Sequence, residues 1–276
     1  METTNMHHSK ITVDGCNAAI SDTGGDHLPV FLFHGNSSSR KVYSELILRN
    51  SGKYRLIAVD FPGHGDTPLP DWALDGVSIS RIGSFAYSVI NHFGFNDFVV
   101  VGQSIGGHAL IENDNIIESA SGICLLSSPP INEHTIGQAF LESPVMPLLF
   151  QGELNSEELD ALCNHFIYRD KPRLASRILT DLKRTDTRFR SLLGLGMETE
   201  GIKDELCALG KFRHDVLMIR GSHDGFIASQ YYDSIQEVPL WKDTLFEFDC
   251  GHCISLEAPQ LLWNCLSEYI DSVCPS

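Results

Sequence analysis

The chain of 276 residues is long enough to bury a substantial core, and its 42% hydrophobic and 20% charged residues are typical of a globular protein. Its formal net charge of −16 argues against nucleic acid or an anionic membrane surface as a partner. The polar start METTNMHHSK lacks the apolar core of a signal peptide, and no apolar run approaches the roughly 20 residues of a membrane span, so we expect a soluble, cytoplasmic protein.

Predicted strands and helices alternate along the chain. KITVD and NAAIS, joined through Asp14 and Gly15, predict an antiparallel hairpin. Apolar runs typical of strands buried on both faces follow at 28–33, 54–60, 97–102 and 122–127, with helical patterns at 38–51, 79–94 and 105–117. Two later strands, at 215–221 and 244–249, are each followed by a helical pattern. This alternation predicts an α/β fold: a mostly parallel twisted sheet flanked by helices.

Residues 131–214 interrupt the alternation. The segment lacks a convincing buried strand, and SEELDALCNHFIYRD and PRLASRILTDLKRT show helical apolar spacing with charged faces. Asn155 before an acidic pair indicates the start of one helix, and Pro172 the start of the next. We therefore expect a helical cap at 131–214, inserted into a core of 1–130 and 215–276. Such a cap would cover the edge of the sheet where open α/β sheets bind ligands.

The strongest functional pattern surrounds Ser104. In VVVGQSIGGHAL a buried strand runs through the G-x-S-x-G pentapeptide into a helix, the context in which this motif holds a nucleophile on a sharp, strained turn. The glycines let strand and helix approach closely. The backbone N–H of Ile105 then lies at a helix N-terminus, aimed where negative charge would develop. A glycine- and serine-rich turn without function is the alternative interpretation.

A serine hydroxyl is a poor nucleophile until a base takes its proton, and the loops after the last two strands supply candidates. Asp224 follows DVLMIRG and His252 follows TLFEFD, so both are expected at the same edge of the sheet as Ser104. His252 is assigned as general base and then general acid, and Asp224 as the residue that orients its ring and stabilises the imidazolium. Asp249 and Asp215 are rival acids, but Asp224 is preferred because it follows its strand.

Two glycine-containing loops complete the predicted site. HGNSSS follows the strand at 28–33, and the backbone N–H of Asn36 is expected to pair with that of Ile105 as an oxyanion hole. His34 is expected to brace this loop through a ring hydrogen bond. DFPGHGDT lacks the Lys-Ser/Thr pair of a phosphate-binding loop and is interpreted as scaffolding near the site.

Cys250 and Cys253 form a C-x-x-C pair around His252 that invites a redox or metal interpretation. A redox pair should open a helix after the first strand of a thioredoxin-like unit, and a zinc site would need a further ligand that no second paired motif supplies. We therefore expect no metal and no cofactor, although the two thiols could make the site sensitive to oxidation.

With HGN, PGHG, GQSIGG, GSHDGF and GHCISLEAP in order, the chain resembles the α/β-hydrolase superfamily along almost its whole length. More narrowly, HGNSSS, PGHG, SSPP with GQAF, and LW-K-T before the last strand resemble the metal-independent N-acyl-homoserine lactonases, which are quorum-quenching enzymes. The resemblance implies a catalytic triad, an oxyanion hole and an acyl-chain pocket under the cap. The residues that would take the first two roles are Ser104, Asp224 and His252, and Asn36 and Ile105. Gln103, before the nucleophile, and Cys253, after the histidine, depart from the family pattern.

The resemblance implies a serine hydrolase that opens the lactone ring of N-acyl-homoserine lactones through an acyl-enzyme. Its partner would be a small-molecule lactone or ester with an acyl chain, and a homodimer is an assembly that the sequence leaves open. Gln103 is expected to contact substrate, and Tyr168, on a cap helix, either contacts substrate or serves packing. A general carboxylesterase, a carbon–carbon bond hydrolase of the same fold and a non-catalytic ligand-binding receptor are the alternatives.

Overall fold

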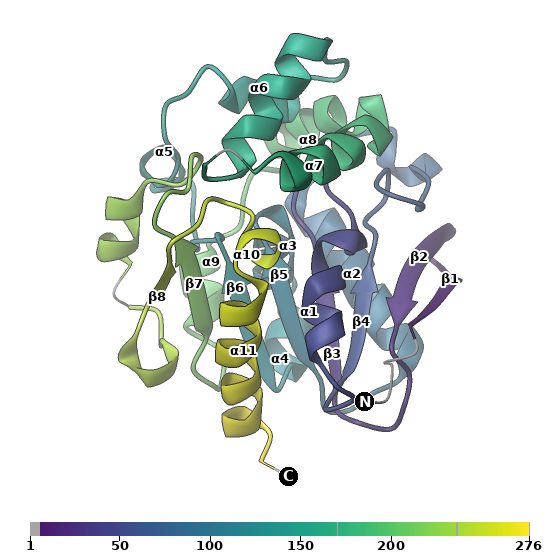
Figure 1. Ribbon diagram of the computed structural model, residues 1–276, viewed down its shortest axis with the longest axis vertical. Helices are drawn as coiled ribbons and strands as arrows, with labels where there is room; N and C mark the ends of the chain where they lie inside the picture. Colours follow the sequence, from purple (N-terminus) through teal and green to yellow (C-terminus); the bar gives the residue numbers. More distant parts are fainter. Residues whose placement is uncertain (1–5, 170, 236, 276) are drawn as a thin grey trace.

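The computed structural model describes residues 6–169, 171–235 and 237–275. In these residues an eight-stranded sheet has the order β1-β2-β4-β3-β5-β6-β7-β8 (Figure 1). The hairpin strands β1 (His7–Val13) and β2 (Cys16–Asp22) are antiparallel, and β2 also pairs with β4 in the antiparallel sense. The other neighbouring strands are parallel, which confirms the predicted α/β fold with a mostly parallel sheet.

The remaining strands are short, and most of their residues are buried. They are β3 (Pro29–Phe33), β4 (Arg55–Val59), β5 (Val99–Gln103), β6 (Gly122–Leu126), β7 (Leu217–Gly221) and β8 (Phe246–Phe248). They begin within two residues of the start of each predicted run and end within one residue of its end. Strands covered by helices on both faces carry continuous apolar side chains, which is why the runs locate them. The predicted hairpin is also confirmed, and its turn places Asp14 and Gly15 at positive φ.

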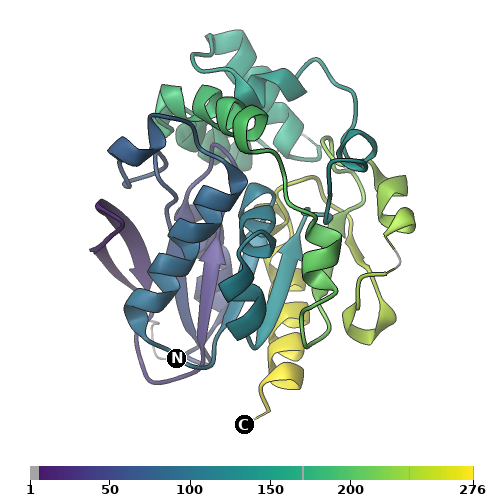
Figure 2. The same ribbon diagram turned by 180° about the vertical axis from the view of Figure 1, so that it is seen from behind.

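Helices cover both faces of the sheet. α1 (Ser44–Arg49) and α11 (Pro259–Val273) lie on the face seen in Figure 1, and α2 (Ile79–Phe93) lies on the opposite face, in front in Figure 2. The apolar residues of α2 recur every three or four positions and are buried, as an amphipathic helix requires. Its ends are set by the Ser78 side chain, which accepts the N–H of Arg81, and by Gly94 in the left-handed conformation.

Three predicted helices differ in the structure. The pattern at 105–117 forms two helices, α3 (Ile105–Ile111) and α4 (Asp114–Ser119), because the side chain of Asn113 accepts the N–H of Ile116 and starts a new helix. The pattern at 38–51 begins as the 3-10 helix η1 (Arg40–Tyr43) before α1. After β7 only the short 3-10 helices η4 (Ser229–Ser234) and η5 (Trp241–Asp243) form, and α10 (Ile254–Glu257) follows β8.

Between β6 and β7 the chain leaves the sheet and forms helices. These are α5 (Ile136–Ala139), η3 (Met146–Phe150), α6 (Ser156–Phe166), α7 (Pro172–Arg184), α8 (Thr187–Glu200) and α9 (Glu205–Leu209). Figure 1 shows α6, α7 and α8 lying across one end of the sheet as a cap. α9 instead packs against α3 and α4 on the core. The division of the chain at residues 131 and 214 stays a proposal.

Local capping explains where two of these helices begin. Asn155 and Glu158 form a capping box at the start of α6, and Pro172 is the first residue of α7, as predicted. None of the helices in the described ranges has both the length and the apolar character that crossing a bilayer would require.

Candidate active site

The register of the parallel strands brings two predicted loops together. Phe33, the last residue of β3, pairs with Gly102 near the end of β5. Gly35 therefore packs directly on Ser104: a Cβ atom added at Gly35 would lie 3.1 Å from the Cβ atom of Ser104. The loop that contains Asn36 thus borders the loop that contains the candidate nucleophile, at the edge of the sheet beneath the cap.

Ser104 has an unusual backbone conformation, with φ 54° and ψ −127°, between β5 and α3. A non-glycine residue in this region is strained by roughly 1–3 kcal/mol, and such strain gathers at functional sites. Its neighbours have to be small: a Cβ atom at Gly106 would lie 2.6 Å from the carbonyl oxygen of His34, and one at Gly102 would lie 2.5 Å from the Cα atom of Gly107. The predicted sharp turn at this serine is confirmed.

His252 and Asp224 are hydrogen-bonded to each other. Gly221 of β7 pairs with Phe248 of β8, so the loops that follow these strands are adjacent. Nδ1 of His252 lies 2.8 Å and 3.0 Å from the two carboxylate oxygens of Asp224, and the two side chains are only 3% and 5% exposed. The Asp224 carboxylate also accepts the N–H of Phe226 at 2.9 Å. These contacts hold both groups in one orientation.

The electrostatics of Asp224 favour the carboxylate. Burial by itself would raise the pKa of Asp224, but His252 and the N–H of Phe226 outweigh burial and keep this pKa below its ordinary value. The rival acids lie elsewhere. Asp249, whose side chain is 66% exposed, lies 3.1 Å from the ring of His223, and Asp215 accepts the hydroxyl of Tyr269 through its backbone oxygen.

Ser104 and His252, two members of the candidate triad, both line a small cavity of about 10 Å³, together with Gln103 and Asn36. That volume corresponds to about one water molecule. Among the described residues the Ser104 hydroxyl makes no hydrogen bond to the imidazole, and catalytic hydrogen bonds commonly tighten only when substrate is bound. Oε1 of Gln103 accepts the hydroxyl of Ser255 at 2.7 Å, which ties the residue before the nucleophile to the segment after His252.

A second cavity of about 290 Å³ also borders Ser104. Asn36, Ser104 and Ile105 line it, so the two cavities meet at Asn36 and Ser104. Its other walls are mainly apolar and include Ile79, Ile131, Phe140, Leu149, Leu193 and Met197. In the described part of the chain, the backbone N–H groups of Asn36 and Ile105 donate no hydrogen bond. Both remain available to an oxygen atom of a bound molecule.

Tyr168 differs from its predicted position. It lies in the bend after α6 and not on a cap helix. Its ring stacks on His223 with the centroids 3.5 Å apart, and its backbone N–H donates to Glu257. Tyr168 is not one of the described residues that line either cavity beside Ser104. These contacts are those of a packing residue.

Two buried histidines hold the loops around the site. The ring of His34 accepts the N–H of Phe61 at 3.0 Å through Nε2, and its Nδ1 lies 2.7 Å from the carbonyl oxygen of Gly35. The predicted bracing role of His34 is confirmed. His64, in the PGHG loop, in turn accepts the N–H of Ser37, which lies in the loop of His34, at 3.0 Å. The sequence interpretation gave this second histidine no role, although its place in the predicted scaffolding loop was a hint.

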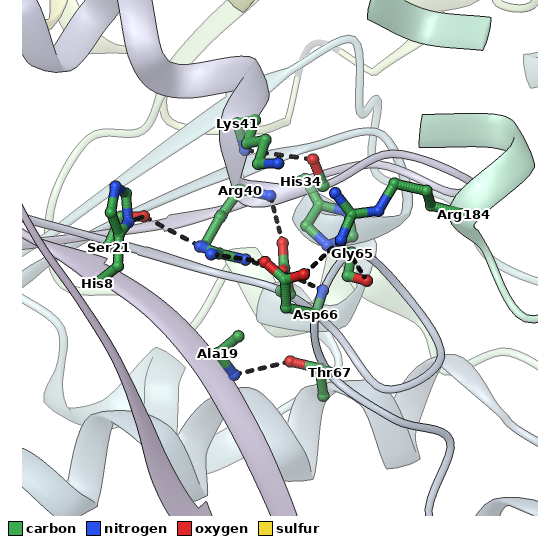
Figure 3. Close-up of polar contacts among 12 residues, drawn as sticks. His8, Ala19, Ser21, His34, Arg40, Lys41, Gly65, Asp66, Thr67 and Arg184 are labelled. Carbon is green, nitrogen blue, oxygen red and sulfur yellow. Dashed lines mark hydrogen bonds and ion pairs between the residues drawn. The ribbon is translucent and has the colours of Figure 1, made fainter. Parts of the chain in front are cut away.

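Arg40 joins the same two loops through charge (Figure 3). Its guanidinium forms an ion pair with the fully buried Asp60, donates to Asp66 at 2.9 Å and donates to Ser21 at 3.0 Å. Arg184, from the cap, pairs with Asp66 from the other side. This network fixes the loop after β3, and with it Asn36, against the core and the cap.

Two cap residues that the sequence did not single out also reach the site. Asp181 on α7 lines the small cavity and accepts the hydroxyl of Ser39 at 2.9 Å, and burial raises the pKa of Asp181 to about 6. Arg190 on α8 is 1% exposed and donates to Ser37 at 3.2 Å and to the carbonyl oxygen of Gly152 at 2.7 Å. Asp181 belongs to the segment PRLASRILTDLKRT, whose charged residues the sequence analysis assigned to a helical face.

The C-x-x-C pair consists of free, buried cysteines. Burial raises the pKa of Cys250 to about 12 and also raises that of Cys253, so both thiols are protonated near neutral pH. Among the described residues there is no group of three or more His, Cys, Asp or Glu side chains arranged to hold a metal ion.

A larger groove of about 710 Å³ lies at the opposite edge of the sheet, because Leu28 and Asp97, which precede β3 and β5, line it. Its wall includes Lys53 and Asp271, which form an ion pair with each other. This groove contains none of the predicted catalytic residues, so the candidate active site is the one at the other edge.

Comparison with known proteins agrees with this architecture. The model of a family described as the alpha/beta hydrolase family matches residues 30–263. A curated relative, the pimeloyl-[acyl-carrier protein] methyl ester esterase of Legionella pneumophila (strain Paris), is 31% identical over 86 residues. That match spans 31% of this chain and 31% of the esterase, so it covers less than a third of the relative's length.

Solved structures are similar over nearly the whole chain. The N-acyl homoserine lactonase AidH, crystallised with N-butanoyl homoserine, has a TM-score of 0.85 and 24% identity, and the alignment covers 99% of this chain and 98% of AidH. A thermophilic esterase from Thermogutta terrifontis has a TM-score of 0.78 and 16% identity, with 98% and 99% of the two chains covered. At these identities the likeness shows a shared fold.

Proposed function

The chain belongs to the alpha/beta hydrolase family, and on that premise we propose that it hydrolyses carboxylic esters and opens the lactone ring of N-acyl-homoserine lactones. In this proposal Ser104 is the nucleophile, His252 the general base and acid, and Asp224 the residue that orients the imidazole. The observation that supports it most is the position of the strained Ser104, where a small cavity shared with His252 meets an apolar cavity of about 290 Å³.

The first half of the reaction forms an acyl-enzyme. Oγ of Ser104 attacks the lactone carbonyl carbon while Nε2 of His252 takes the hydroxyl proton. The carbonyl oxygen becomes an oxyanion that accepts the N–H groups of Asn36 and Ile105. The ring C–O bond then breaks and His252 returns the proton to the leaving oxygen. The acyl group stays on Ser104 and carries its own alcohol.

The second half releases the product. A water molecule in the small cavity attacks the acyl-enzyme, and His252 takes a proton from this water. The second oxyanion collapses, the bond to Oγ breaks, and the proton passes from His252 to Ser104. The product is the ring-opened N-acyl-homoserine. These steps draw only on side chains and backbone N–H groups of the protein, so activity is expected to survive treatment with a chelator.

The apolar cavity suits an acyl chain, since its walls beyond Asn36, Ser104 and one histidine are apolar. Each buried methylene contributes about 0.8 kcal/mol, so chain length should control affinity. A volume of about 290 Å³ is at the lower end for small-molecule sites, which run from roughly 300 to 1,000 Å³. We therefore expect short acyl chains to be preferred.

The direct test uses N-hexanoyl-homoserine lactone as substrate. Opening of the lactone gives an acid that closes again after acidification, whereas cleavage of the amide releases homoserine lactone irreversibly. The wild-type protein is expected to give the reversible product, and Ser104→Ala to give none above the uncatalysed rate. Amide cleavage, or equal product with the alanine variant, would contradict the proposal.

A general carboxylesterase is the second candidate, supported by the 31% identity over 86 residues to a methyl ester esterase. The same triad serves both reactions, so the substrate pocket decides between them. Comparison of kcat/KM for N-hexanoyl-homoserine lactone and for p-nitrophenyl hexanoate separates the candidates. Turnover of the open ester without turnover of the lactone would favour the esterase.

A further inference from the structure

The apolar cavity beside Ser104 contains one ionisable side chain in its wall, that of His108, as far as the structure describes the chain. His108 lies on α3, and its backbone N–H donates to the carbonyl oxygen of Ser104. The two residues are therefore four positions, or about one helical turn and roughly 6 Å, apart along the helix axis. A substrate whose carbonyl carbon lies over Ser104 and whose chain enters this cavity has to pass His108.

The ring of His108 is held by a buried acid. Its Nδ1 lies 2.9 Å and 3.0 Å from the two carboxylate oxygens of Glu205, a residue of α9 that is 0% exposed. Glu205 also accepts the N–H of Ile131 at 2.8 Å, so the acid itself has little freedom to move. The orientation of the imidazole is consequently set before any ligand enters the cavity.

The second ring nitrogen has no such partner. His108 as a whole is 5% exposed, and within the described residues Nε2 makes no hydrogen bond to the protein. Burial opposes protonation of the ring, but the charge and hydrogen bond of Glu205, with a further contribution from Glu112, raise the pKa of His108 above its ordinary value. In its protonated form, which Glu205 favours, the ring presents Nε2–H as a donor, and donors of this kind make the stronger, charge-assisted hydrogen bonds.

An unpaired donor in an apolar cavity discriminates between ligands. A plain alkyl chain would displace water from Nε2–H and leave this donor without an acceptor, which is costly in a buried site. A chain that carries an oxygen within hydrogen-bonding distance of Nε2 would replace the displaced water. Sites that hydrogen-bond one polar atom of a substrate reject analogues that lack this atom far more strongly than apolar pockets reject a missing methylene.

We propose that His108 determines substrate specificity, and that the preferred substrates carry a keto or hydroxyl oxygen on the acyl chain about one helical turn from the carbonyl that Ser104 attacks. The inference rests on the proposed function, since it takes the apolar cavity as the acyl-chain pocket. It adds a chemical class to that function: oxygenated acyl chains are favoured over plain chains of equal length.

The chain offers a matched pair of variants. In His108→Asn the amide nitrogen takes the position of Nδ1 and keeps the bond to Glu205, but nothing remains at the position of Nε2. In His108→Gln the amide nitrogen reaches the position of Nε2 and keeps the donor in the cavity. The inference therefore predicts opposite results for two substitutions of similar size and polarity.

The measurement is the ratio of kcat/KM for p-nitrophenyl 6-oxoheptanoate to that for p-nitrophenyl heptanoate. The keto carbon of the first ester is five bonds from the attacked carbonyl carbon, as it is in a 3-oxoacyl-homoserine lactone. We expect the wild-type ratio to be at least about 10, a ratio near the wild-type value for His108→Gln, and a fall to within about twofold of unity for His108→Asn. A wild-type ratio near unity, or an unchanged ratio in His108→Asn, would overturn the inference. Because a wild-type ratio near unity overturns the inference by itself, the inference can be rejected even where a variant fails to fold.

The same comparison with N-(3-oxohexanoyl)- and N-hexanoyl-homoserine lactone separates this inference from the proposed function. Preference for the keto ester without any lactone turnover would reject the lactonase proposal and keep the role of His108. Turnover of both lactones at equal rates, with no preference between the esters, would keep the lactonase and reject the role of His108. Should the wild-type protein hydrolyse none of the four, calorimetry of the two lactones with Ser104→Ala compares their affinities instead, and equal affinity would overturn the inference.

Discussion

The carboxylate of Asp181, on cap helix α7, accepts a hydrogen bond of 2.9 Å from the hydroxyl of Ser39, in the loop after β3. Asp181 is 7% exposed and lines the small cavity that contains Ser104 and His252. The cap is thus fastened to the loop of the predicted oxyanion hole by an acid whose ionisation is unfavourable. Stability and pH should be coupled at this contact.

Replacement of Asp181 by Asn should reduce the dependence of stability on pH. The folded-state pKa of about 6 exceeds the ordinary value of 3.8, so stabilisation from the protonated carboxyl is complete below pH 3.8 and is lost as the pH rises through about 6. At pH 8 the neutral asparagine should raise the free energy of unfolding by about 2–3 kcal/mol relative to wild type. Urea denaturation of both proteins at pH 4 and pH 8 measures this difference, and an equal change in the two proteins would contradict the prediction.

Asp224→Asn should lower kcat for a p-nitrophenyl ester by roughly 10³–10⁴-fold, because the amide cannot hold the imidazole in the required tautomer or stabilise its protonated form. Asp249→Asn is the matched control. Asp249 is the rival acid, but its side chain is 66% exposed and lies beside His223 and not His252. Steady-state kinetics of the two variants should differ by at least about 100-fold, and equal losses would show that the triad acid is assigned wrongly.

The thiols of the C-x-x-C pair should be unreactive in the folded protein. Cys250 and Cys253 are buried and their pKa values are raised, whereas Cys207 is exposed. Iodoacetamide should label Cys207 first at a pH of about 7.5, which is about one unit below the ordinary pKa of a thiol. Peptide mass mapping with and without urea checks the order. Early labelling of Cys250 in the native protein would restore the redox interpretation.

Gly106→Ala should destabilise the fold by about 3 kcal/mol, because the new Cβ atom would lie 2.6 Å and 2.7 Å from the carbonyl oxygens of His34 and Phe33, which are backbone atoms with little freedom to move. Gly137→Ala serves as control, since a Cβ atom at that helical position meets nothing within 4 Å and alanine favours helix. Urea unfolding midpoints compare the two. Similar midpoints would show that the turn at Ser104 tolerates a side chain.

The pattern of residues was sufficient for the elements whose character is local. Continuous apolar runs predicted the strands of the core, and Asn155 with Glu158 predicted the start of α6, because a capping box involves only four consecutive residues. The split of the predicted helix at 105–117 was missed, since the apolar period continues across Asn113 while its side chain ends one helix and starts another.

By itself the sequence determined which strand ends meet at one edge, because parallel strands that alternate with helices have to place their carboxyl ends together. That rule is why Ser104, Asp224 and His252 could be named as candidates from loops far apart in the chain. Only the tertiary structure decided which cap residues reach this edge. Asp181 and Glu205 lie on helices. The periodicity of a helix indicates that one of its faces is buried, but it does not show which residues cover that face. Their contacts with Ser39 and His108 depend on how helices pack across the sheet, and no local pattern contains that information.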